Sequence, residues 1–199
     1  MKKFKLTSEF IVDISGVKLF RIKALIEFGH VKAGDLGGYI EKEENLSHMG
    51  DAWVSGNAQI SDDAWVSGDA WVSGNAQISD DAQISGNARI SDDARISGNA
   101  QIFDDAWVSG DAWVSSDEDY AYAHGFGSVN RTTTFFRLKD GGVGVRCGCF
   151  YGTLAQFRDK IRETHGETKK AQEYLMLADL MELRFEEDEN EVGNRKYVE

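Results

Sequence analysis

The sequence predicts a mainly β protein built as a solenoid, in which short strands wind around a common axis. Between residues 50 and 115 one six-residue unit repeats eleven times without a break. Its general form is Gly or Asp, Asp or Asn, Ala, one of Trp, Gln and Arg, Val or Ile, and Ser. Every unit keeps its Ala and its branched residue. A fixed short period is typical of solenoids, because each repeat buries its apolar side only by stacking on its neighbours.

Read from its branched residue, the unit resembles the hexapeptide repeat of left-handed β-helix proteins, in which three hexads form one triangular coil. The resemblance covers about a third of the chain, and it implies a left-handed parallel β-helix. The sequence itself favours three hexads per coil. Residues 50–67 and 68–85 differ only where Trp65-Val66 becomes Gln83-Ile84, so an eighteen-residue period is stronger than one of twelve.

The direction of each side chain follows from the alternation along a strand. Ala58 and Ile60 share the inner face, and Gln59 points outward. Gly, Asn and Asp are expected at the corners, because they tolerate left-handed backbone conformations. Eighteen residues per coil then stack the outward residues in three columns: Trp53, Trp71, Arg89 and Trp107; Gln59, Gln77, Arg95 and Trp113; and Trp65, Gln83 and Gln101.

The N-terminal segment, residues 1–35, is expected to form a β cap over the open end of the solenoid. Residues 10–14 and 17–22 have strand composition and flank Ser15-Gly16, which suits a hairpin turn. The β-helix is expected over residues 36–128, beginning with a degenerate coil. Ile40 and Leu46 are six residues apart but Leu46 and Val54 are eight apart, which indicates a two-residue insertion at His48-Met49.

Residues 129–199 are expected to form a C-terminal α+β cap. Residues 131–149 read as a hairpin that turns at residues 140–142. Thr153 and Gln156 have the spacing of a capping box, so a helix is expected to begin there and to end at Gly166. A second helix is expected over about residues 168–184, followed by an acidic tail from Glu186.

All of the net charge lies on the repeat region. The chain carries a net charge of −12, and residues 50–119 hold 14 acidic and 2 basic residues. This balance disfavours direct binding to nucleic acid or to an anionic membrane and favours a basic partner. No segment approaches the ~20 apolar residues of a membrane span. Met1-Lys2-Lys3 leads into no apolar signal core, so a cytoplasmic protein is expected.

Enzymatic alternatives find little support in the sequence. Hexapeptide-repeat acyltransferases resemble one another in a catalytic histidine on a loop between coils, whereas residues 50–115 contain no histidine. The related γ-type carbonic anhydrases hold zinc with three histidines, and His30, His48, His124 and His165 are too scattered for such a set. We expect no catalytic residue, cofactor or metal, with an acyltransferase-like enzyme as the alternative.

The two cysteines are separated by one residue, which is poor spacing for a disulfide. Cys147 and Cys149 are expected on one strand, pointing the same way. One alternative is that a cysteine thiol acts as nucleophile with His165 as its base. We favour a structural role, as small residues beside a helix.

The aspartates at the corners are the first candidate partner-binding residues. Four of them stand where other hexads have Gly, and each is followed by a second aspartate; the pairs are Asp62 and Asp63, Asp80 and Asp81, Asp92 and Asp93, and Asp104 and Asp105. Turn geometry does not call for charge there, and stacked like charges repel. The aspartates therefore serve either to bind a partner or to keep the solenoid soluble. Twelve net charges over ~19 Å of coil is about one per ~1.6 Å, close to the ~1.7 Å of duplex DNA. This density suggests a DNA mimic.

The outward tryptophans are the second candidate set, because exposed aromatic residues usually mark contacts. We expect them to be at least partly exposed and to contact a partner or a second copy of the chain. These residues are Trp53, Trp65, Trp71, Trp107 and Trp113.

The flanking segments carry a further resemblance. Residues 34–41 with 45–47, and residues 148–154 with 163–166, are similar to segments of small hexapeptide-repeat proteins encoded by phages and prophages. The resemblance implies a non-enzymatic, host-directed role. The leading hypothesis is therefore a binding protein that inhibits a host defence protein or another basic DNA-binding protein, such as a nuclease. A structural protein that self-assembles through its Trp faces or its C-terminal cap is a further alternative.

Overall fold

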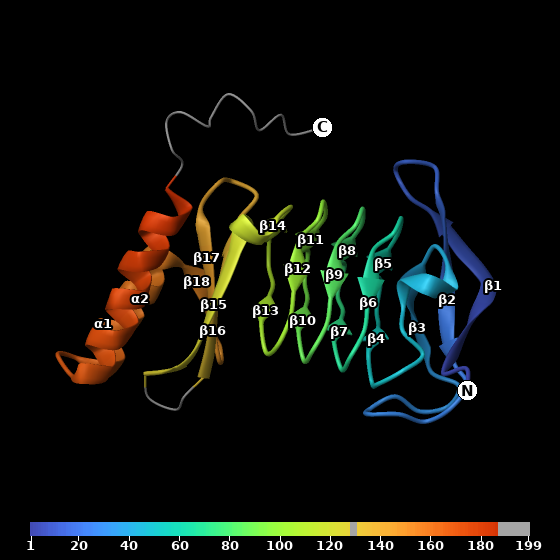
Figure 1. Ribbon diagram of the computed structural model, residues 1–199, viewed down its shortest axis with the longest axis horizontal. Coiled ribbons are helices and arrows are strands. Elements are labelled where there is room, and N and C mark those ends of the chain that lie inside the picture. The colour runs from blue at the N-terminus through green and yellow to red at the C-terminus, as the bar shows by residue number, and fades with distance from the viewer. Residues whose placement is uncertain (128–130, 187–199) are drawn as a thin grey trace.

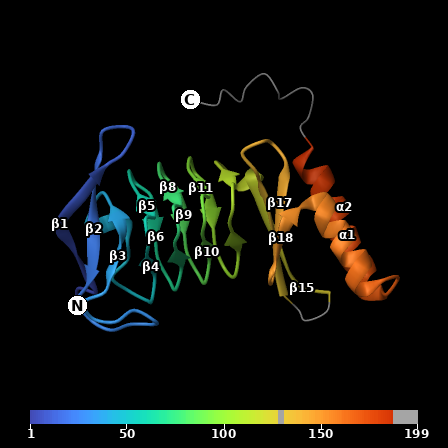
Figure 2. The ribbon, with the colours of Figure 1, turned by 180° about the vertical axis from the view of Figure 1, so that it is seen from behind.

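The protein is a rod in which a parallel β-solenoid of about four turns lies between two caps. The computed structural model describes residues 1–127 and 131–186. The N-terminal cap and the C-terminal helices occupy opposite ends of the rod (Figure 1), and the view from behind shows the same order (Figure 2). The predicted class, mainly β with a solenoid and two caps, is confirmed. The left hand of the coil stays a prediction from the resemblance.

Three parallel sheets form the three faces of the solenoid, and each face is named by its first and last two-residue strand. The β4–β13 face contains β4 (Trp53–Val54), β7 (Trp71–Val72), β10 (Arg89–Ile90) and β13 (Trp107–Val108). The β5–β14 face contains β5 (Gln59–Ile60), β8 (Gln77–Ile78), β11 (Arg95–Ile96) and β14 (Trp113–Val114). The β6–β12 face contains β6 (Trp65–Val66), β9 (Gln83–Ile84) and β12 (Gln101–Ile102).

The register confirms the eighteen-residue coil and the three predicted columns. Trp53 pairs with Trp71, Gln59 with Gln77, and Trp65 with Gln83. Each coil donates backbone hydrogen bonds to the next, as from Gln59 N to Ala76 O at 2.9 Å. Inside, every Ala and every branched residue of the eleven hexads is at most 1% exposed. The interior is therefore a dry stack of small and branched side chains.

The first coil contains the predicted two-residue insertion. Ile40 pairs with Ile60, and Leu46 forms a parallel bridge with Val66, so both lie twenty residues from their partners. Val54 pairs with Val72, eighteen residues away. The two extra residues therefore lie between Leu46 and Val54, as the spacing predicted.

The N-terminal cap extends one solenoid face with antiparallel strands. β1 (Phe4–Val12) and β2 (Lys18–Ala24) form the predicted hairpin, and the first strand begins six residues earlier than expected. β3 (Leu36–Ile40) pairs antiparallel with β2 and parallel with β5. A short 3-10 turn, η1 (Glu43–Asn45), follows. The cap thus converts an antiparallel hairpin into the first parallel rung.

The C-terminal cap begins with a four-stranded antiparallel sheet. After the turn η2 (Asp117–Asp119), its strands follow one another in space in chain order; they are β15 (Tyr120–Phe126), β16 (Arg131–Arg137), β17 (Val143–Cys147) and β18 (Phe150–Thr153). β16 and β17 are the predicted hairpin. Residues 120–126 were expected inside the β-helix range 36–128, and this placement is wrong. They pair antiparallel with β16, because their alternating Tyr and Ala side chains fit an open sheet rather than a hexad corner.

The cap sheet lies between two cores, and adjacent phenylalanines of β16 point into different ones. Phe136 is fully buried in the solenoid core, and Phe135 is fully buried against the helices. Helix α1 (Leu154–His165) has the predicted Thr153 and Gln156 capping box and ends at Gly166. Helix α2 (Lys169–Phe185) follows. The expected tail lies beyond Glu186, outside the described residues. No described helix is long and apolar enough to cross a membrane.

Candidate functional site

The corner residues form three edges that run along the solenoid. Edge 1 comprises residues 55–57, 73–75, 91–93 and 109–111. Edge 2 comprises residues 61–63, 79–81, 97–99 and 115–117. Edge 3 comprises residues 49–51, 67–69, 85–87 and 103–105. The eight candidate aspartates are divided among them. Edge 1 carries Asp92 and Asp93, edge 2 carries Asp62, Asp63, Asp80 and Asp81, and edge 3 carries Asp104 and Asp105. Only edge 2 stacks two aspartate pairs on adjacent coils.

The first aspartate of each pair has a structural role that was not predicted from the sequence. Asp62, Asp80, Asp92 and Asp104 all have φ between 56° and 63°, the left-handed region that glycine occupies in other hexads. The carboxylates of Asp62, Asp80 and Asp92 accept backbone hydrogen bonds from the next coil, and that of Asp104 accepts one from the Tyr122 hydroxyl of the cap sheet. Gly98 N donates to Asp80 Oδ2 at 2.9 Å, and Gly110 N donates to Asp92 Oδ2 at 3.2 Å.

These bonds correct the expectation that the corner has no use for charge. A carboxylate there satisfies a backbone N–H on the next turn, which offsets part of the repulsion between stacked acids. The second aspartates differ. Asp93 and Asp105 accept hydrogen bonds from Asn75 and Asn87 of the preceding coil, and Asp63 pairs with Lys42 at 2.5 Å. This ion pair lowers the pKa of Asp63. It is the one ion pair made by a corner aspartate within the described residues.

Edge 2 also forms one wall of a groove. The groove has a volume of about 380 Å³ and lies between the β1–β2 hairpin tip and the β5–β14 face. Asp62 and Asp80 line one side, and Val12 and Ile14 line the other. Val12 is 55% exposed and Ile14 is fully exposed. Acidic and apolar groups therefore face one another across this groove.

The tryptophans do not form the exposed column that was expected. Trp53 is only 2% exposed, because the loop after β2 folds over it and places Phe28 edge-on at 5.5 Å. Trp71, Trp107 and Trp113 are half-buried, and Trp65 is 45% exposed on a different face. A continuous Trp surface for self-assembly is therefore absent from the described solenoid.

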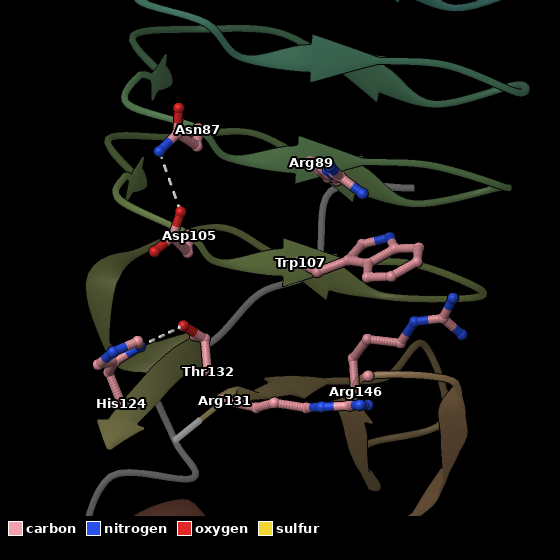
Figure 3. Close-up of a pocket in the computed structure, with 9 residues that line it drawn as sticks. Asn87, Arg89, Asp105, Trp107, His124, Arg131, Thr132 and Arg146 are labelled. Atoms are coloured by element: carbon pink, nitrogen blue, oxygen red, sulfur yellow. Dashed lines mark hydrogen bonds between the residues drawn. The ribbon is translucent and has the colours of Figure 1, made fainter. Parts of the chain in front are cut away.

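A second groove, which was not predicted from the sequence, crosses the β4–β13 face. It has a volume of about 750 Å³ and runs from His30 of the N-terminal loop past Trp71 to Trp107. At the C-terminal cap it continues into a pocket of about 300 Å³ lined by three arginines, Arg89, Arg131 and Arg146 (Figure 3). In its stacked column Arg89 stands among Trp53, Trp71 and Trp107, and this exchange of Trp for Arg is the one sign of the pocket in the repeat.

Cys147 and His165 contact other residues of the C-terminal cap. Cys147 accepts a hydrogen bond from Thr133 Oγ1 at 3.2 Å. Cys149 is exposed in the turn after β17, because Gly148 has φ 59° and ends the strand; the expectation that both cysteines share one strand is wrong. His165 stacks on Tyr174 with ring centroids 5.9 Å apart. Among the described residues, no group of three or more His, Cys, Asp or Glu side chains could hold a metal ion.

Comparison with known families agrees with the solenoid. The model of the YdcK beta solenoid repeat matches residues 58–74, 82–98, 94–110 and 100–116. These segments lie within the coils and together cover about a quarter of the chain. Each match spans roughly one coil, so the family model and the strand register describe the same repeat. No curated protein matches the chain.

Proposed function

We propose that the chain is a non-enzymatic binding protein that holds a basic partner protein on edge 2. The observation that carries the proposal is the groove in which Asp62 and Asp80 face the exposed Val12 and Ile14. Apolar side chains supply the contact area of an interface, whereas charges steer the partner and fix its register. Edge 2 offers both within one surface.

The finer proposal is a phage- or prophage-type inhibitor of a host defence or DNA-binding protein, such as a nuclease. Two arguments support it: the flanking segments resemble phage-encoded proteins, and the charge per length of the solenoid is close to that of duplex DNA. The acids lie on three straight edges instead of winding around the rod. A basic channel would therefore meet one edge, and edge 2 has the densest aspartate stack.

The experiment compares two variants that remove the same charge from different edges. The edge 2 variant changes Asp62, Asp63, Asp80 and Asp81 to Asn. The control variant changes Asp92, Asp93, Asp104 and Asp105 to Asn. Asn keeps an oxygen acceptor at each corner and tolerates the left-handed backbone, so both variants should fold. Each serves as bait for host-cell lysate beside the original chain, with bound proteins identified by mass spectrometry.

We expect a basic protein that the original chain and the control variant capture equally and that the edge 2 variant captures several-fold less. Duplex DNA should compete for this protein, and added salt should weaken its binding. Equal loss in both variants would show that total charge matters and edge 2 does not. Capture that is unchanged in both variants would refute the acidic-surface proposal altogether.

A further inference from the structure

The arginine pocket is a basic site within an acidic protein. Its three arginines come from separate parts of the chain: Arg89 from β10 of the solenoid, and Arg131 and Arg146 from β16 and β17 of the cap sheet. Figure 3 shows Trp107 between Arg89 on the solenoid side and Arg146 on the cap side, with Arg131 further along the cap sheet. Trp107 N donates a hydrogen bond to Thr134 Oγ1 at 2.9 Å, which fixes the cap sheet against this coil.

Two of the guanidinium groups lie over the same indole ring. The guanidinium carbon of Arg146 is 3.7 Å from the ring centroid of Trp107, and that of Arg89 is 5.6 Å from it. The two guanidinium carbons therefore lie no more than 9.3 Å apart, the sum of these distances. The indole offsets part of their repulsion through cation–π contacts, but it supplies no hydrogen-bond acceptor.

None of the three arginines forms an ion pair with a described carboxylate. Arg146 Nε is buried and has no hydrogen-bond partner among those residues. The carboxylate that lines the pocket, Asp105, instead accepts a hydrogen bond from Asn87 Nδ2 at 3.0 Å. Arg89 and Arg131 are exposed, and Arg146 is half-buried. The pocket therefore offers three guanidinium groups whose charges are not paired with a described carboxylate, which favours an anionic ligand.

We propose that this pocket binds the phosphoryl group of a small organic phosphate. Guanidinium forks suit phosphate oxygens, and three arginines line this one pocket. The pocket shares Arg89 and Trp107 with the larger groove, which leads to Trp71. The organic part of the ligand lies there, against the indole of Trp71. Asp51 and Asp69 at the far end of the groove repel a second anionic group, so the ligand binds in one orientation. This site is independent of edge 2 and its partner.

A matched pair of variants tests the phosphoryl contact. Arg89→Gln removes a pocket arginine, and Arg95→Gln removes the equivalent arginine of the next face, whose guanidinium lies 5.7 Å from the ring of Trp113. Gln occupies the same hexad position in other coils, so both variants should fold. Binding of inorganic phosphate and of phenyl phosphate is measured by calorimetry on the full chain.

We expect Arg89→Gln to weaken phosphate binding about tenfold, the effect of one charge-assisted contact, and Arg95→Gln to change it less than about twofold. Phenyl phosphate should bind more tightly than phosphate, and Trp71→Gln should remove that advantage. Equal weakening by Arg89→Gln and Arg95→Gln, or no binding by the original chain, would overturn the site. Citrate that binds as tightly as phenyl phosphate would overturn the phosphoryl assignment.

Discussion

The width of the coil interior can be tested with one substitution, Ala82→Leu. Ala82 is fully buried in the middle of the solenoid, and its outward neighbour Gln83 is exposed. Ala64 and Ala100 occupy the same position one coil before and one coil after, and both are also buried. Trp65 N donates to Ala82 O at 2.9 Å, and Gln83 N donates to Ala100 O at 2.9 Å. The backbone around Ala82 is therefore held by both neighbouring coils.

The magnitude follows from the space available. Three extra carbons would contribute about 2.4 kcal/mol if they were buried without strain, at ~0.8 kcal/mol per methylene. The rungs are ~4.8 Å apart and cannot separate without breaking their ladders. Overpacking a close-packed interior costs about 1–3 kcal/mol net. We expect a value near the top of that range, about 3 kcal/mol, because the coil cannot widen.

The assay is thermal and denaturant unfolding of the original chain, Ala82→Leu and the control Gln83→Leu. The control places the same side chain on the adjacent residue, pointing outward. A loss of about 3 kcal/mol corresponds to a lower Tm by roughly 6–12 °C for a chain of this size. The control should stay within about 0.5 kcal/mol of the original. If Ala82→Leu is as stable as the control, the argument that a narrow interior selects Ala is wrong.

Two further predictions concern the N-terminal cap. Burial lowers the pKa of Lys3 from 10.5 to about 8, although the negative charges of Asp51 and Asp69 act in the other direction. Between about pH 8 and 10.5, Lys3 is therefore protonated in the unfolded chain and neutral in the folded one. The stability of the original chain should therefore rise relative to Lys3→Met across that window, by at most about 3 kcal/mol; a constant difference would contradict the cause given for the pKa. Trp53→Gln should destabilise by about 3 kcal/mol or more, whereas Trp65→Gln should change stability by less than about 1 kcal/mol. If chemical denaturation shows that Trp53→Gln and Trp65→Gln are equally destabilising, the cap does not cover Trp53.

The repeat was predictable because its information is local and repeated. The pattern within each hexad indicates which side chains point inward, and the near-identity of residues 50–67 and 68–85 indicates eighteen residues per coil. The same logic found the insertion before Val54, since a break in a fixed period is visible without a structure. The signals for the ends of helix α1 were also local, because Thr153 and Gly166 hydrogen-bond to backbone groups close by in the sequence.

The errors arose where one segment folds onto another that is distant in sequence. Trp53 is buried by Phe28, and no periodicity links that loop to the first full coil. Residues 120–126 have strand composition, but their partner strand was not evident from the alternation alone. The hydrogen bonds to Asp80 and Asp92 appear only when the corners are stacked. Likewise, the arginine pocket exists only because the cap sheet meets the last coil.

The positions of the two proposed sites make them separable in experiments. Edge 2 joins the β5–β14 and β6–β12 faces, so in a three-sided coil it lies opposite the β4–β13 face that carries Arg89. A partner on edge 2 leaves the pocket open, and a phosphate in the pocket is separated from Asp62 and Asp80 by the dry interior. The edge 2 variant should therefore lose the protein partner and keep phosphate binding, and Arg89→Gln should do the reverse. If one variant removes both activities, the two sites are coupled through the coil, and the assignment of separate binding surfaces is wrong.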